Sequence, residues 1–267
     1  MSVTTIDRAT GLLPATATLA GRALRRFVRT PQEIIAGTAT MAMFILIFRY
    51  VFGGQIAAIG DLAYVDFLVP GYLATAVLFN GMGTAAAVAE DLEQGVVDRL
   101  RSLPSPRVAF LAGRAVADTM VLAWSLLVAT LVGFAIGFRV QGAPLDALLA
   151  MALLVAFGFA FVWLFIALGL VSGSAKGAQG LSFLVFPLTF VSSAYVQVDT
   201  LPGLLRPFAE HQPLTMMINA VRGLMQGPAA QALLDQPTSV YVTRSLLWTA
   251  AILAVAVPLA VARYRRG

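Results

Sequence analysis

Residues 147–171 read ALLAMALLVAFGFAFVWLFIALGLV, an unbroken apolar run without a charged side chain. A helix needs about 20 mostly apolar residues to cross a hydrocarbon core of about 30 Å. A helix is favoured there because it satisfies its backbone N–H and C=O groups internally, in a layer that offers no water. This run therefore predicts a transmembrane helix.

The composition extends this interpretation to the whole chain. Of the 267 residues, 59% are hydrophobic and 12% are charged, whereas a soluble domain has about 45–50% apolar and about 25% charged residues. The apolar residues come in long blocks, so we expect one membrane domain over residues 1–267. The net charge of +5 is too small and too scattered to indicate a nucleic-acid partner. The absence of cysteine excludes disulfides and thiolate metal sites.

Six segments have the length and composition of membrane spans, so the predicted fold class is an all-α integral membrane protein with six transmembrane helices. The predicted spans are residues 34–52, 67–89, 115–138, 147–171, 177–198 and 245–262.

The distribution of basic residues predicts the orientation. Most of the 18 lysines and arginines lie before the first span, after the sixth, or in the links that follow the second and fourth spans. By the positive-inside rule these segments, and with them both termini, are cytoplasmic in a cell membrane. We expect no cleavable signal peptide, because the first apolar run begins only near Ile34, behind a long segment that contains arginines.

Residues 15–30 have the pattern of a basic amphipathic helix. Ala20, Leu24 and Phe27 fall on one helical face, while Arg22 and Arg25 fall on the other. Such a helix lies in the membrane surface in contact with lipid. The alternative is a disordered basic leader that only sets the topology.

Residues 199–228, between the fifth and sixth spans, are too apolar for a solvated loop. Leucines recur at helical spacing from Leu201, Pro213 is placed to open a second helix, and Gly227 is placed to close it. Helices of this length cannot span a membrane, and they are tolerated at membrane depth only where protein or a wet cavity surrounds their ends. We therefore expect an outer re-entrant segment; the alternative is an amphipathic helix lying on the outer surface.

The link at residues 90–107 is the most structured polar segment. Its acids precede its arginines, an order that favours a short helix with negative charge at its start, halted before Pro104. Leu92, Val96 and Leu100 share one face, and such an apolar ridge either invites a partner protein or packs against the protein's own helix ends. Just beyond the link, Arg114 and Asp118 lie one helical turn apart and predict a local ion pair.

Several of these residues form an ordered pattern that resembles a known family. The pattern in the link is Gly95, Asp98, Arg99, Leu100, Pro104, Arg107, Gly113, Arg114 and Asp118. The pattern in the outer segment is Leu201, Pro202, Gly203, Pro207, Phe208, His211, Gln212, Pro213, Leu214, Thr215, Ala220, Arg222 and Gly223. Together they resemble the ABC type 2 exporter permeases, most closely the daunorubicin-resistance type, and the resemblance covers nearly the whole chain. Gln212 is a departure, because many members have Asn there.

The resemblance implies roles for these residues. The link becomes a coupling loop that docks into a separate ATPase subunit, with Glu90, Asp91, Leu92, Gly95, Asp98, Arg99, Leu100 and Pro104 as its candidate residues. Pro213 and Arg222 belong to the outer re-entrant segment. Phe79, Asn80, Gly81 and Phe183 are candidates for a translocation path or a dimer seam, although lipid-facing or packed positions suit the aromatics equally well.

The chain lacks the apparatus to hydrolyse ATP. A phosphate-binding loop needs Gly, four residues, Gly, Lys and Ser or Thr, and the single lysine, Lys176, lacks that context. We therefore expect no enzyme activity and no cofactor in this chain, with ATP and magnesium bound by the partner ATPase. The single histidine, His211, excludes a two-histidine metal site, so no metal is expected.

The leading hypothesis is thus an exporter permease that pairs with a second copy or a paralogue and moves an amphipathic drug or a lipid-like molecule out of the cell. An alternative is a secondary transporter driven by an ion gradient, which would need carboxylates at the membrane midplane. A third is a membrane enzyme or a non-transporting assembly subunit. The spans contain no such midplane carboxylates, and the acids at residues 90–98 are balanced by arginines.

Overall fold

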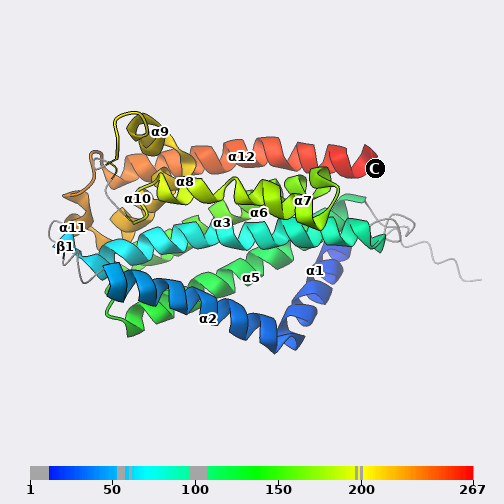
Figure 1. Ribbon diagram of the computed structural model, residues 1–267, viewed down its shortest axis with the longest axis horizontal. Helices are drawn as coiled ribbons and strands as arrows, with labels where there is room; N and C mark the ends of the chain where they lie inside the picture. The colour runs from blue at the N-terminus through cyan, green and yellow to red at the C-terminus, as the bar shows by residue number, and fades with distance from the viewer. Residues whose placement is uncertain are drawn as a thin grey trace, which may run out of the picture.

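The computed structural model describes residues 12–52, 58–59, 62–96, 107–195, 198 and 201–266, almost all of them helical (Figure 1). The elements are α1 Leu12–Arg29, α2 Pro31–Ile47, the π-helical turn η1 Phe48–Phe52, β1 Ala58–Ile59, β2 Leu62–Ala63, α3 Tyr64–Glu93, α5 Arg107–Ala135, α6 Pro144–Ser172, α7 Ala175–Phe183, α8 Phe186–Phe190, α9 Arg206–His211, α10 Pro213–Gln226, α11 Pro228–Gln231 and α12 Thr238–Arg266. The all-α fold class is confirmed, apart from one small antiparallel hairpin that pairs β1 with β2.

Within the described residues, four helices are long and apolar enough to cross a membrane: α3, α5, α6 and α12. Helices α3, α6 and α12 contain the predicted second, fourth and sixth spans and extend beyond them at both ends. Helix α5 starts before the predicted third span but ends at Ala135, short of the predicted end at residue 138. The extensions are polar turns such as Asp91 and Arg265, which hydropathy alone does not assign to a span. The chain is therefore a multi-pass membrane protein.

The other two predicted spans have a different form. Residues 34–52 are divided between α2 and η1, and their apolar helical part, Thr38–Val51, is shorter than the four long helices. Residues 177–198 do not form one helix, which corrects the prediction: α7 ends at Phe183 and α8 begins at Phe186. Pro187 explains the break, because proline lacks an N–H and its ring clashes with the carbonyl four residues earlier, which is that of Phe183.

The helices α3 and α6 form the buried centre of the bundle, while α5 and α12 flank them and expose most of their surface. Close contact between the two central helices depends on small residues. A Cβ atom at Gly81 of α3 would lie 2.0 Å from the ring of Phe165 of α6, and a Cβ at Gly169 of α6 would lie 2.6 Å from the carbonyl oxygen of Ala85. The small residues of the second predicted span thus serve packing within the chain at these positions.

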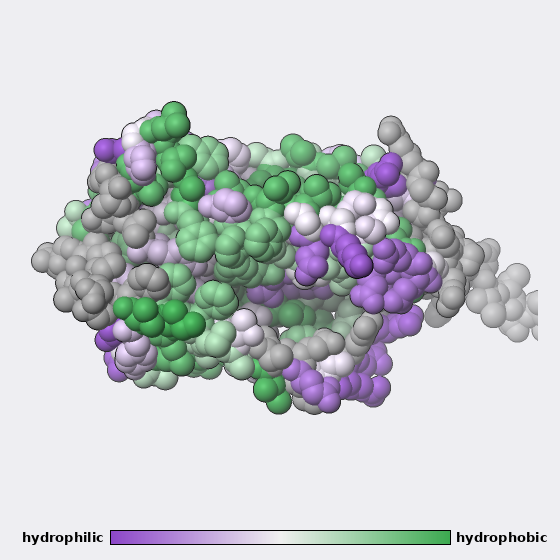
Figure 2. All heavy atoms as spheres, viewed as in Figure 1, coloured by the Kyte–Doolittle hydropathy of each residue, from purple (hydrophilic) through white to green (hydrophobic). Residues whose placement is uncertain are grey.

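The two ends of the bundle differ in character. Figure 1 shows α1 and the last turn of α12 at one end, and α9, α10, α11 and β1 at the opposite end. On the face drawn in Figure 2, hydrophilic residues gather at the end that holds α1, and apolar residues cover the middle. Helix α1 covers the predicted residues 15–30 except the last, since it ends at Arg29; Ala20 is buried, and Arg22 and Arg25 are exposed. Its position in the membrane surface stays a prediction.

At the opposite end, the short helix α10 is enclosed by α3, α6 and α12, and nearly all its residues are buried. Both of its ends are covered by other segments. The side-chain amide of Gln212, at its N-terminus, donates to the carbonyl of Val191. The backbone amides of Gln141 and Gly142 donate to the carbonyl of Met225, at 3.0 and 2.9 Å. The protein thus supplies the surroundings that a helix too short to span needs at membrane depth.

Candidate functional site

The predicted coupling link starts at the C-terminus of α3. Helix α3 ends at Glu93, Gln94 caps it, and the amide of Gln94 donates to the Glu90 carboxylate at 2.9 Å. Gly95 then has a φ of +66°, a left-handed conformation that favours glycine and turns the chain out of the helix. The remaining candidate residues of the link, Asp98, Arg99, Leu100 and Pro104, lie outside the described residues.

Arg114 joins the two helices on which the link is mounted. Its guanidinium pairs with Asp118 of its own helix, α5, at 2.8 Å, as the spacing in the sequence predicted. It also pairs with Asp91 in the last turn of α3, at 3.0 Å. The Arg114 and Asp91 side chains are only 19% and 23% exposed, so the pair is shielded from water more than an ordinary surface salt bridge. Arg114 therefore connects the two stems of the link.

The last turns of α3 also contact a third helix. A carboxylate oxygen of Glu93 accepts a hydrogen bond from the backbone N–H of Ala175, the first residue of α7, at 3.3 Å. Leu92 packs into the apolar cluster that includes Leu111 and Ala115 of α5. Of the two alternatives for the apolar ridge, Leu92 therefore fits packing against the protein's own helix ends rather than contact with a partner protein. The last turn of α3 is thus in contact with both α5 and α7.

Two of the proposed pathway residues belong to a continuous cluster of rings. The ring of Phe183 on α7 stacks on that of Phe186, with the centroids 5.1 Å apart, and the ring of Phe79 on α3 is tilted against Phe186, with the centroids 5.8 Å apart. The cluster continues through further ring contacts, so that it consists of Phe44, Phe48, Phe79, Phe183, Phe186, Phe190 and Tyr195. Several of these rings are open to the surroundings, Phe183 being 58% exposed. We call this set the aromatic cluster.

The other two pathway candidates are placed differently. Asn80 is half-buried and donates its side-chain amide to the carbonyl of Ala76, in its own helix. Gly81 is buried against Phe165, so it serves the packing of α3 on α6. Of the four candidates, the structure therefore brings only Phe79 and Phe183 into one cluster.

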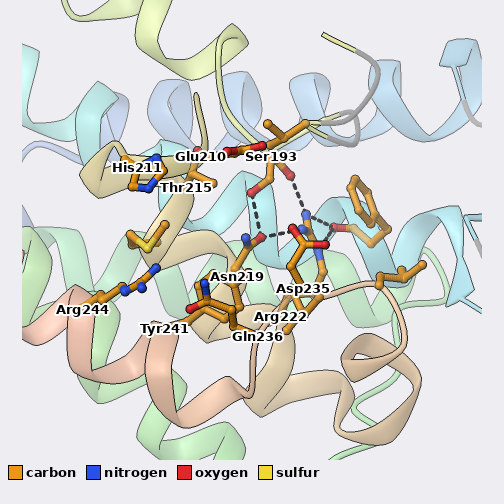
Figure 3. Close-up of a pocket in the computed structure, with 15 residues that line it drawn as sticks. Ser193, Glu210, His211, Thr215, Asn219, Arg222, Asp235, Gln236, Tyr241 and Arg244 are labelled. Atoms are coloured by element: carbon orange, nitrogen blue, oxygen red, sulfur yellow. Dashed lines mark hydrogen bonds between the residues drawn. The ribbon is translucent and has the colours of Figure 1, made fainter. Parts of the chain in front are cut away.

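In the outer segment, Pro213 is the first residue of α10, where its missing N–H leaves no hydrogen bond unmade. Arg222, two turns further, is only 2% exposed and lies over the ring of Phe67, 3.7 Å from its centroid. Its guanidinium donates to the backbone carbonyls of Ser193 and Phe67, at 2.7 and 3.2 Å, and to the amide oxygen of Asn219, at 3.3 Å (Figure 3). Arg222 thus joins α10 to α3 and to the segment after α8.

Sequence reasoning missed one contact and three residues. The link partner Asp91 was assigned to the coupling loop without its contact to Arg114, because the two are 23 residues apart. Phe186 and Tyr195 complete the aromatic cluster but carry no pattern of their own. Asp66, in the first turn of α3, is buried and accepts a hydrogen bond from the backbone N–H of Arg139 at 2.9 Å. An acid at the start of an apolar run is the one signal that could have found Asp66.

Comparison with known proteins gives the family. Residues 14–225 match the profile of the ABC-2 type transporters. The chain is 33% identical over 216 residues to the daunorubicin resistance ABC transporter permease protein DrrB1 of Streptomyces coeruleorubidus, covering 80% of this chain and 76% of that protein. It is 26% identical over 247 residues to the probable doxorubicin resistance ABC transporter permease protein DrrC of Mycobacterium tuberculosis, covering 92% of this chain and 86% of the relative. It is also 24% identical over 209 residues to the inner membrane transport permease YadH of Escherichia coli, covering 74% of this chain and 78% of that protein. The chain therefore belongs to the ABC-2 type transporter family.

Proposed function

We propose that this chain is the membrane-spanning permease subunit of an ATP-driven exporter, and that a separate ATPase subunit docks on the link at residues 90–107. The observation that carries the proposal is the contact of Arg114 with Asp91 and Asp118, because it joins α3 and α5, the two membrane helices that flank this link. The drug-resistance permeases among the relatives support export as the direction.

In this proposal the link transmits movement, and this chain performs no chemistry. ATP and magnesium bind in the partner, and closure of the ATPase dimer displaces the link. The displacement reaches α3 and α5 through Arg114 and reaches α7 through the contact of Glu93 with Ala175. A cargo is moved only when it binds the inward-facing and outward-facing states with different affinity.

The proposed topology has six crossings. Four are the long apolar helices; α2 with η1 supplies the first crossing, and α7 with α8 supplies the fifth as a broken helix. Both termini are then cytoplasmic, and α10 is a re-entrant helix at the outer side. The burial of α10 and the covered state of its two ends support this assignment.

The proposed pathway forms between two permeases, this chain and a second copy or a paralogue. The exposed rings of the aromatic cluster, Phe44, Phe183 and Phe190, lie on α2, α7 and α8 and offer flat apolar surfaces to a cargo. Such a surface suits an amphipathic drug or a lipid-like molecule, because aromatic rings stack on flat apolar groups at little cost in conformational entropy.

The test is co-purification of a tagged chain from membranes in mild detergent. We expect an ATPase to co-purify with the wild-type chain and to be lost in Leu100→Asp, which places a charge on the apolar ridge of the link. The matched control is Leu204→Asp, the same substitution at a 91% exposed position at the opposite end of the molecule, which should retain the ATPase. A preparation without ATPase that still transports in ATP-depleted vesicles would instead establish a carrier driven by an ion gradient.

A further inference from the structure

A polar cavity of about 110 Å³ lies at the end of the molecule opposite the C-terminus, between α9, α10 and the start of α12 (Figure 3). A single water molecule needs only about 10–15 Å³ by this measure, so the cavity has room for a small polar group. The cavity reaches the surface of the protein, because one of its lining residues, His211, is exposed. The proposed function assigns no role to this cavity.

The inner wall of the cavity contains a buried positive charge. Within the described part of the chain, the guanidinium of Arg222 is bonded to neutral acceptors alone, which are two backbone carbonyls and the Asn219 amide. Among the described residues no carboxylate lies within ion-pair distance of Arg222. A buried cation without a counter-charge is costly, so the arrangement favours an anion in the adjacent space.

A second group on the same face of α10 also lacks a partner. Thr215, Asn219 and Arg222 follow the spacing of one helical face and all line the cavity. The hydroxyl of Thr215 is buried, and within the described part of the chain it has no hydrogen-bond partner. A buried hydroxyl is normally satisfied by protein or by a bound molecule. Thr215 and Arg222 together thus offer hydrogen-bond donors to an oxyanion.

The charged side chains around the opening indicate how much negative charge the bound group should carry. Arg244 of α12 adds a second positive side chain to the cavity wall. Of the two lining acids, Glu210 is paired with Arg206 at 2.7 Å, so its charge is compensated outside the cavity. Among the described residues that line the cavity, two arginines then stand against one carboxylate without an ion-pair partner, that of Asp235. This balance suits a group with a single negative charge, such as a phosphodiester.

The surroundings of the opening favour a lipid as the source of that group. The rim helix α9 and the turn before it expose large apolar side chains: Leu204 is 91% exposed and Phe208 is 52% exposed. Figure 2 shows apolar residues over this corner, where Figure 1 places α9. An acyl chain lying on this apolar edge would keep its head group beside the cavity, which a free phosphate ion would not require.

We propose that the cavity is a phospholipid site: it binds the phosphodiester of one membrane lipid against Thr215 and Arg222, while an acyl chain lies along α9. In the orientation proposed above, this lipid belongs to the outer leaflet. The site does not depend on the identity of the cargo or on the ATPase, so it can fail without affecting the exporter assignment.

The test uses the full chain, purified in detergent and stripped of lipid, with thermal unfolding followed as each probe is added. The probes are a dioleoyl phospholipid with a phosphoglycerol head group, dioleoylglycerol as its phosphate-free counterpart, and inorganic phosphate. We expect the phospholipid to raise the Tm with saturation and dioleoylglycerol to leave it unchanged. In Thr215→Val, which removes a hydrogen bond to a charged group, the lipid concentration at half-saturation should rise roughly tenfold. In Arg244→Gln, which removes the second positive charge of the cavity wall, it should rise by about the same factor.

The controls separate this site from general contact with lipid. Thr243→Val and Arg263→Gln make the same substitutions at exposed positions outside the cavity, and they should respond to the phospholipid as the wild-type chain does. Equal stabilisation by dioleoylglycerol, or an unchanged response in both cavity variants, would show contact with the acyl chains alone and overturn the site. If inorganic phosphate saturated the site at the same concentration as the phospholipid, the assignment to a lipid would be wrong, and the cavity would be a site for a free anion.

Discussion

At the scale of single residues, Arg114 is the side chain on which the proposed coupling depends. It holds Asp91 and Asp118 near one guanidinium, so its removal leaves two partly buried carboxylates close together. We expect Arg114→Gln to lower the free energy of unfolding by roughly 2 kcal/mol. Asp118→Asn should cost less, because the contact between Arg114 and Asp91 remains. Thermal unfolding in detergent measures the stability of both variants, with Arg263→Gln at an exposed position as the control. An unchanged Tm in Arg114→Gln would show that the two carboxylates do not need the guanidinium between them.

Two neighbouring glycines of α3 provide a matched pair for the packing of the bundle. A Cβ at Gly81 would meet the ring of Phe165 at 2.0 Å, whereas a Cβ at Gly83 would meet nothing within 4 Å. We expect Gly81→Ala to destabilise the protein by about 1–3 kcal/mol through overpacking. Gly83→Ala should leave stability unchanged or raise it, because alanine favours a helix by about 1 kcal/mol over glycine. Chemical denaturation of the two variants tests the contact, and equal midpoints would contradict it.

These residues show what sequence reasoning can reach at this scale. The pairing of Arg114 with Asp118 was predictable, because residues four apart in a helix are neighbours by geometry. The pairing of Arg114 with Asp91 was not, since it depends on how α3 and α5 lie after the intervening link. Gly81 and Gly83 are equivalent in the sequence and differ only in which helix faces them. Long-range partners of this kind are decided by packing, which periodicity does not encode.

At the scale of elements, the turn between α5 and α6 covers the C-terminal end of α10. Gly142 lies so close to α10 that a Cβ would be 2.3 Å from the carbonyl oxygen of Leu224, a backbone atom that cannot move aside alone. We expect Gly142→Ala to displace this turn and to lower the free energy of unfolding by roughly 1–3 kcal/mol. Gly203→Ala, where a Cβ would meet nothing within 4 Å, is the control. Thermal unfolding distinguishes the two; equal Tm values would show that the turn adjusts freely.

The hydropathy of each segment explains which elements could be predicted from the sequence. The long helices α3, α5, α6 and α12 follow from hydropathy, because a continuous apolar run has few other stable forms in a membrane. The break between α7 and α8 was missed because hydropathy does not register Pro187, although the proline rule places the end of α7 at Phe183. The hairpin of β1 and β2 has only two residues in each strand, too few for any alternation to be recognised.

At the scale of the whole molecule, three independent features lie at one end. This end carries α1 with its exposed arginines, the last turn of α12 with its basic residues, and the contact of Glu93 with the start of α7. The stems of the link meet there as well, through Arg114. A docked ATPase would therefore face the basic, polar end, and the cavity at Arg222 would lie on the other side of the membrane.

That arrangement predicts a simple asymmetry in chemical labelling. The chain contains no cysteine, so a single introduced thiol is the only target for a maleimide. Lys176 and Leu204 are both exposed but lie towards opposite ends of the bundle. A membrane-impermeant maleimide should label Leu204→Cys in intact cells, and should label Lys176→Cys only after the membrane is opened. Both sites are accessible in the folded chain, so a difference in labelling reports the side of the membrane. Labelling of Lys176→Cys but not Leu204→Cys in intact cells would place the link outside the cell, where no ATPase could reach it. The proposed topology and the exporter proposal would then both be wrong.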